Sequence, residues 1–141
     1  MKTIISLIAL VLVAPSPAAA QQGTASLSIR PDEVVVTRIE GEGFIVLSRG
    51  TEREPGSQAA PATVRFAFVE MPGMGMMLLV ENGYDRAFTY RARMVQGRRS
   101  ARTSTCTTLP GLMTIENWRH QIDRLELSEP LLSDTVEMSC R

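Results

Sequence analysis

The sequence predicts a mainly β protein that folds as a single antiparallel β-sandwich held by one disulfide. Short runs of alternating apolar and polar residues recur along the chain, and this alternation is typical of half-buried strands. Turn residues separate most of the runs at a close spacing, which favours a sandwich or barrel over βαβ units. The only two cysteines, Cys106 and Cys140, are expected to form the disulfide.

Residues 1–20 have the pattern of an export signal. Lys2 gives a positive start, residues 4–13 are apolar, and Ala18-Ala19-Ala20 is a small-residue cleavage site. The apolar run is too short to span a bilayer. We therefore expect a signal peptide over 1–20 that is removed, a single mature domain over 21–141, and a periplasmic or secreted location without a transmembrane span.

The mature chain is nearly neutral, since 15 Lys and Arg minus Lys2 leave 14 Arg against 15 Asp and Glu. Nucleic-acid binders usually carry a strong basic excess, so no nucleic acid is expected as a partner. An oxidising compartment would favour the Cys106–Cys140 disulfide. The closed loop of 35 residues, 106 to 140 inclusive, would add up to about 4 kcal/mol of stability.

Four strands are expected in the first half of the chain, over residues 25–30, 33–39, 44–47 and 64–69. The second of these is rich in valine. In the last, Val64, Phe66 and Phe68 are expected to face the core. Residues 49–62 contain Gly, Pro and several charges without apolar periodicity, which predicts a surface loop.

Residues 76–94 predict two adjacent strands joined by a turn at 81–85. In the second of them Phe88, Tyr90, Ala92 and Met94 share one face, and Thr89, Arg91, Arg93 and Val95 share the other. Residues 100–106 are polar on both faces, which predicts a strand at a sheet edge.

The segment from 114 to 127 fits two structures. Ile115, Trp118, Ile122 and Leu125 have helical spacing, which predicts a short helical or irregular stretch near 114–120. Alternation over 123–127 fits a strand beginning near 122. Pro130 is expected to end that strand, and residues 136–140 are expected to form the last one, carrying Cys140 back to Cys106.

Arginines are concentrated in the second half of the chain. Between Asp85 and Arg102, six positive charges accompany one negative charge: Arg86, Arg91, Arg93, Arg98, Arg99 and Arg102. Guanidinium groups bind carboxylates and phosphates in a bidentate manner. An anion-binding face formed by Arg86, Arg91, Arg93, Arg98 and Arg99 is therefore a hypothesis, with an anionic envelope component or another protein as the partner. An ordinary solvated face is the competing interpretation.

Four methionines, Met71, Met74, Met76 and Met77, lie within seven residues. Thioethers are soft ligands that select Cu(I), and the Met-x-x-Met-x-Met spacing resembles methionine-rich motifs of exported copper-handling proteins. Methionine also fills irregular gaps in hydrophobic cores, and Met76 and Met77 lead directly into an apolar strand. Copper handling is the alternative function.

The sequence contains few candidate catalytic residues. His120 is the only histidine, so a hydrolase that uses it is a third hypothesis, although no Gly-x-Ser-x-Gly motif is present. One histidine and two paired cysteines cannot supply a tetrahedral zinc site. Glu40 and Glu42 flank a glycine turn and are expected to be solvated. No catalytic residue and no cofactor is assigned.

Two resemblances bear on the fold. The stretch from Ala25 to Pro31, followed by Val34-Val35-Val36, resembles the opening strands of periplasmic immunoglobulin-like domains, including pilus chaperones. Those chaperones have two domains and a lysine in the subunit-binding cleft, which a lysine-free mature chain does not match. The residues Asn82-Gly83-Tyr84, Phe88-x-Tyr90-x-Ala92, Cys106, Glu116-x-Trp118 and Cys140-Arg141 are similar to small exported proteins of proteobacteria, a resemblance that implies no activity.

These observations together favour an immunoglobulin-like β-sandwich of the bacterial envelope that acts as a non-enzymatic binding or interaction module. The arginine-rich hairpin or an edge strand is the expected contact surface.

Overall fold

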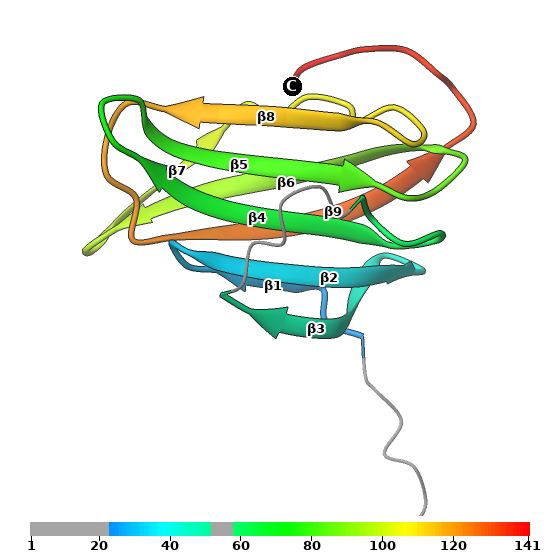
Figure 1. Ribbon diagram of the computed structural model, residues 1–141, viewed down its shortest axis with the longest axis horizontal. Helices are drawn as coiled ribbons and strands as arrows, with labels where there is room; N and C mark the ends of the chain where they lie inside the picture. The colour runs from blue at the N-terminus through cyan, green and yellow to red at the C-terminus, as the bar shows by residue number, and fades with distance from the viewer. Residues whose placement is uncertain (1–22, 52–57) are drawn as a thin grey trace, which may run out of the picture.

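Nine strands in two antiparallel sheets build the part of the chain that the computed structural model describes, residues 23–51 and 58–141. The four-stranded sheet has the order β1-β9-β6-β7, and the five-stranded sheet has the order β3-β2-β4-β5-β8. Figure 1 shows the sheets stacked one behind the other. The predicted antiparallel β-sandwich with one disulfide is confirmed. The strands are β1 (Ser26–Ile29), β2 (Glu33–Glu40), β3 (Gly43–Gly50), β4 (Val64–Met71), β5 (Gly75–Asn82), β6 (Ala87–Gln96), β7 (Arg99–Thr103), β8 (Met113–Trp118) and β9 (Arg124–Ser133).

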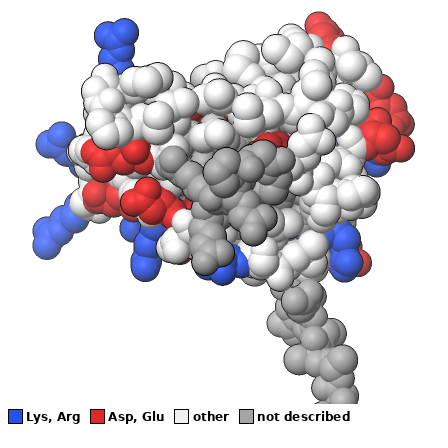
Figure 2. All heavy atoms as spheres, in the orientation of Figure 1, with Lys and Arg blue, Asp and Glu red and all other residues white. Residues whose placement is uncertain are grey.

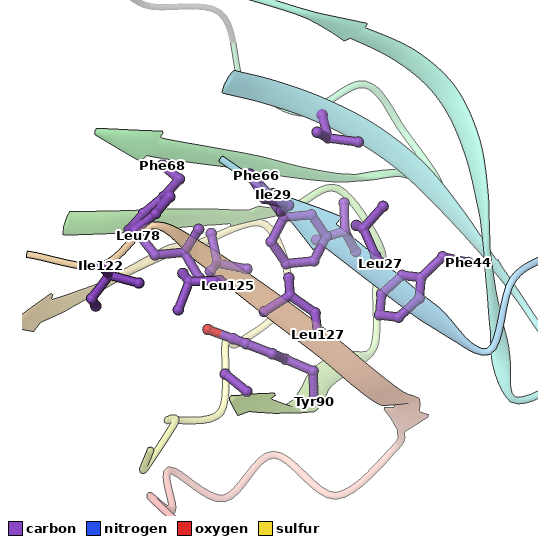
Figure 3. Close-up of a cluster of buried hydrophobic side chains, with 14 of the residues drawn as sticks. Leu27, Ile29, Phe44, Phe66, Phe68, Leu78, Tyr90, Ile122, Leu125 and Leu127 are labelled. Atoms are coloured by element: carbon purple, nitrogen blue, oxygen red, sulfur yellow. The ribbon is translucent and has the colours of Figure 1, made fainter. Parts of the chain in front are cut away.

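The core lies between the sheets and is built from the inward-facing residues of every named strand except β7, together with Ile122 (Figure 3). Phe66 of β4 lies at its centre. The centroid of the Phe66 ring is 6.2 Å from that of Phe44, 6.0 Å from Phe88 and 5.9 Å from Tyr90, all in edge-on geometry. Such aromatic contacts add to the burial of the rings themselves. The predicted inward residues Val64, Phe66 and Phe68 are all fully buried.

The prediction of two adjacent strands over 76–94 is correct for the strands and wrong for their pairing. β5 belongs to the five-stranded sheet and β6 to the four-stranded sheet, so the chain passes from one sheet to the other between them. Asn82 Nδ2 donates to the backbone oxygens of Arg86 (2.7 Å) and Thr108 (3.0 Å), and Asn82 Oδ1 accepts from the Tyr84 N–H (3.0 Å). In a hairpin, such backbone groups would pair with the neighbouring strand. Here the Asn82 side chain satisfies them, so the chain can leave its sheet after β5.

The helical stretch predicted near 114–120 is a strand. β8 pairs with β5, with Trp118 opposite Met76 and Ile115 opposite Leu79. The helical spacing of the apolar residues does not reflect a shared face. Both Ile115 and Trp118 belong to β8, but Trp118 is buried whereas Ile115 points outward with half of its surface exposed. Pairing with a neighbouring strand decides this segment, and local spacing does not contain that information.

The end of the chain also differs from its prediction. Pro130 does not end a strand but lies inside β9, at an irregularity of the β6–β9 pairing. Residues 136–140 form no strand beyond an isolated bridge between Cys140 and Cys106. Val136 and Met138, which lie in this segment, are both exposed. A bulge tolerates proline because one residue is already unpaired there.

The predicted edge strand and disulfide are both present. β7 is the last strand of its sheet, and its residues are exposed except for the half-buried Thr103. Cys106 and Cys140 are bonded, and the backbones of Thr105 and Arg141 exchange two hydrogen bonds of 2.9 Å beside them. In antibody domains the disulfide joins central strands of the two sheets. Here it joins two segments outside the named strands.

The described residues contain no helix that is long and apolar enough to cross a membrane. The predicted signal peptide and positions 52–57 of the predicted 49–62 loop lie outside the described residues.

Candidate binding site

Two neighbouring rows across the outer face of the four-stranded sheet consist of polar residues. The strand register places Ser28, Glu126, Arg93 and Arg102 side by side in one row across the sheet. A second row joins Ser26, Ser128 and Arg91. No residue of either row is apolar. The alternation of β6 produces this face, because the residues between its arginines, Tyr90 and Ala92, are buried.

The outer face of the five-stranded sheet is different. One row across it consists of Val34, Ala67, Leu79 and Ile115, all apolar. The next row contains Arg65 and Glu81, whose side chains form an ion pair at 2.7 Å and are only 12% and 16% exposed. Figure 2 shows this side of the molecule, and its charged side chains gather toward the two ends of the view. The arginine-bearing face is the opposite one.

Arg93 and Arg102 are direct cross-strand partners on β6 and β7. Arg93 Nη1 donates to Ser100 Oγ at 3.0 Å. Among residues 23–51 and 58–141, no carboxylate lies within ion-pairing distance of either guanidinium. Like charges directly opposite each other on a sheet are destabilising. A bound anion would remove this repulsion, because two guanidinium groups can share its oxygens.

Arg91, on the same face, has a partner. Its Nε donates to Glu129 Oε2 at 2.6 Å, and both side chains are more than half exposed. Glu129 has φ 50°, a left-handed conformation that non-glycine residues seldom adopt, and it immediately precedes Pro130. It lies in the bulge of β9, where Ser128 pairs with Arg91 and Leu131 with Thr89. A bulge of this kind re-aims side chains and often accompanies a functional site.

A groove of about 930 Å³ crosses this face and includes both Arg91 and Arg102. Its volume is in the range of small-ligand sites. Its lining includes the carboxylates of Glu42 and Glu129 and the guanidinium groups of Arg91, Arg102 and Arg141. The complete lining is Ala25, Ser26, Glu42, Thr89, Tyr90, Arg91, Ala92, Arg102, Thr103, Ser104, Thr105, Ser128, Glu129, Pro130, Leu131 and Arg141.

The other arginines of the predicted face lie apart from this groove. Arg86 Nε donates to Asp134 Oδ1 at 2.8 Å, and Arg86 Nη2 donates to the Leu132 carbonyl at 3.1 Å. Arg98 lies in the turn between β6 and β7, and Arg99 begins β7, pairing with Gln96. The structure therefore brings Arg91, Arg93 and Arg102 together and places Arg98 and Arg99 at the tip of the same hairpin.

The methionine cluster is divided by the sheet. Met76 is fully buried in the core, while Met77 follows it on β5 and points to the other face. Met74 is exposed in the turn before β5, and Met71 ends β4 opposite Gly75. Met76 therefore cannot share a site with Met77, which leaves Met71, Met74 and Met77 as the methionines on or near one face. In the described residues, no group of three or more His, Cys, Asp or Glu side chains is arranged to hold a metal ion.

His120 and Tyr90 occupy opposite environments. His120 is exposed in the loop between β8 and β9, and it has no hydrogen bond or ion pair with another described side chain. Tyr90 is buried, and its hydroxyl has no partner among the described residues. Burial, with a smaller contribution from the Glu116 charge, raises the pKa of Tyr90 well above its ordinary value. The phenol therefore stays neutral at physiological pH and belongs to the core.

Sequence reasoning did not find Ser26, Ser128, Glu129 or Arg141 as parts of a site. Ser26 and Ser128 become neighbours only through the β1–β9 register, which no local pattern encodes. Pro130 was the one available signal of the bulge, because proline inside a strand is compatible with a bulge or an edge.

Comparisons with models of protein families, with curated proteins and with solved structures returned no match to this chain.

Proposed function

We propose that this protein is an exported, non-enzymatic binding module that holds an anionic ligand of the bacterial envelope on the outer face of its four-stranded sheet. The observation that carries the proposal is the Arg93–Arg102 pair. Two guanidinium groups face each other across β6 and β7 without a carboxylate partner among the described residues. Glu126 lies opposite Arg93 on β9 but its ion pair is with Arg124, so the two facing guanidinium groups offer an anion two forked donors.

The rigidity of the support favours binding over catalysis. β6 lies inside the sheet between β9 and β7, so Arg91 and Arg93 project from a paired strand rather than from a loop. His120, the only histidine of the chain, lies in the β8–β9 loop and outside the groove. What the surface offers is positive charge and hydrogen-bond donors.

Export is part of the same proposal. The Cys106–Cys140 bond is compatible with an oxidising compartment, and residues 1–20 have the composition of a signal peptide. Fractionation of cells that express the full chain, with mass spectrometry of the product, tests this part. We expect an oxidised protein that begins at Gln21 in the periplasm or medium, and a cytoplasmic, full-length, reduced product would contradict it.

Binding is tested by calorimetry with two anions of different chemistry, inorganic polyphosphate and an oligogalacturonate. We expect at least one to bind, and the double variant Arg93→Gln, Arg102→Gln to weaken it roughly tenfold or more through the loss of two charge-assisted contacts. The matched control is Arg38→Gln, Arg119→Gln, which removes two exposed arginines outside this face. Equal losses in both double variants, or no binding of either anion, would overturn the proposal.

A further inference from the structure

We infer that the groove across the four-stranded sheet is a site for an acidic oligosaccharide, a chain of sugar rings that carries carboxylate, sulfate or phosphate groups. This inference rests on the proposed function, because it assigns a ligand class to the same arginine-bearing surface. The inference is carried by one juxtaposition: hydroxyl side chains line the same extended groove as guanidinium and carboxylate groups.

The groove has the length of a chain molecule rather than of a single ion. Its lining residues come from all four strands, with Ser26 on β1, Ser128 on β9, Arg91 on β6 and Arg102 on β7. Neighbouring strands lie about 4.8 Å apart, so the groove extends over roughly 14 Å from the first strand to the last. A single phosphate would occupy only a small part of it.

Hydroxyl residues line the groove without a side-chain hydrogen-bond partner in the part of the chain that the structure describes. The side chains of Ser26, Thr89, Ser104 and Ser128 line the groove, and none of them forms a side-chain hydrogen bond with another residue of the described ranges. Each hydroxyl can donate one hydrogen bond and accept others. A ligand with many hydroxyl groups can both donate hydrogen bonds to these side chains and accept hydrogen bonds from them, whereas a bare polyphosphate can only accept hydrogen bonds.

The charges in the groove have both signs. Arg102 has no carboxylate partner among the described residues, and Glu42 likewise takes part in no ion pair there. Arg91 and Glu129 are paired with each other. A uniformly negative surface, such as an anionic membrane or polyphosphate, would meet repulsion from Glu42 and Glu129. An acidic sugar places its anionic group on the guanidinium groups and its neutral hydroxyl groups on the carboxylates.

The two middle strands of the groove are closed to the addition of a peptide strand. An extended peptide binds by pairing its backbone with an open sheet edge. Here the groove crosses the strands, and the floor strands β9 and β6 are each paired on both sides. Over β9 and β6, side chains therefore provide the available polar contacts. Leu131, which is 56% exposed, adds an apolar contact for the C–H faces of sugar rings.

An array of acidic and neutral oligosaccharides, probed with the full mature chain, tests the inference. We expect carboxylated, sulfated or phosphorylated glycans to be retained over their neutral counterparts, with inorganic polyphosphate a poorer competitor than the soluble glycan. Ser128→Phe fills the groove and should weaken glycan binding roughly tenfold or more. Ser48→Phe is the matched control, because Ser48 is exposed on β3 of the other sheet.

If Ser128→Phe does not fold, the triple variant Ser26→Ala, Thr89→Ala, Ser128→Ala removes only hydroxyl groups and should weaken binding to a similar extent. Retention of no acidic glycan, with polyphosphate still bound through Arg93 and Arg102, would overturn this inference and leave the proposed function standing. Binding of no anion at all would overturn both. Glycan binding that neither groove variant changes would show that the groove is not the site.

Discussion

The two outer faces of this sandwich are built by the same strand alternation and have opposite characters. Across the five-stranded sheet runs the apolar row Val34, Ala67, Leu79 and Ile115, and across the four-stranded sheet runs the charged row Ser28, Glu126, Arg93 and Arg102. The two charge pairs of these faces differ in the same way. Arg65 and Glu81 are nearly buried, whereas Arg91 and Glu129 are open to solvent.

The comparison separates a charge pair whose two members depend on each other from charges that are free to bind a ligand. A pair with little exposure has lost its hydration, so each partner depends on the other. A pair in solvent contributes little to stability and can exchange its partner for a ligand. Substitutions on the two faces should therefore have opposite consequences for stability and for binding.

The largest expected effect comes from removing the disulfide that borders the groove. Cys106→Ala with Cys140→Ala should reduce the free energy of unfolding by about 3–4 kcal/mol, since the closed loop is long. Hydrogen exchange should then show faster exchange at the amides of Thr105 and Arg141, which pair beside the disulfide, than at Ala67 in the other sheet. Uniform acceleration at all three amides would show that the faces do not loosen independently.

Arg65→Ala should have the next largest effect. It leaves the Glu81 carboxylate nearly buried without its partner, at a cost of about 3 kcal/mol in urea denaturation. The double variant Arg65→Met, Glu81→Met replaces both charges and should recover most of the loss. If Arg65→Ala were as stable as the wild type, the Arg65–Glu81 pair would not differ from the exposed Arg91–Glu129 pair in its effect on stability.

Glu129→Gly should raise stability by about 1 kcal/mol, because glycine adopts a positive φ without strain and the exposed ion pair contributes little. The same substitution should weaken binding of the acidic glycan. A gain in stability with a loss of binding is the combination expected of strain kept at a binding site. Thermal denaturation and glycan titration of one preparation measure both, and a loss of stability would contradict this account.

Arg93→Gln should have the smallest effect, a gain of up to about 0.5 kcal/mol at low salt that disappears at high salt. The gain comes from relief of the repulsion between Arg93 and Arg102, which screening also removes. Urea titrations at two salt concentrations measure it. Arg38→Gln is the control, since Arg38 lies near Glu40 at 3.8 Å, and it should show no such gain.

Much of the fold could be predicted from the sequence because each strand carries its own alternation. The inward set of Val64, Phe66 and Phe68 and the outward pair of Arg91 and Arg93 follow from period two alone. Pairing between distant strands could not be predicted. The segment that forms β8 is predicted from the sequence as a short helical or irregular stretch, because its partner, β5, lies more than thirty residues earlier in the chain.

The candidate site was predicted in part for the same reason. Arg91 and Arg93 share one strand, so their common face was visible in the sequence, and the position of Arg102 opposite Arg93 follows only from the hairpin register. Glu129 and Ser128 enter the groove because β9 lies beside β6, an arrangement of strands nearly forty residues apart. Composition indicated the chemistry of the surface and register determined its geometry.

The bulge in β9 has a consequence for deletion experiments. Ser128 pairs with Arg91 and Leu131 with Thr89, so two residues of β9, Glu129 and Pro130, stand opposite the single residue Tyr90 of β6. A chain lacking only Glu129 would have one residue opposite Tyr90 and would keep Leu131 opposite Thr89 and Leu132 opposite Phe88, with one ladder hydrogen bond still unmade because Pro130 has no N–H. What the shortened chain would forfeit is a carboxylate in the groove.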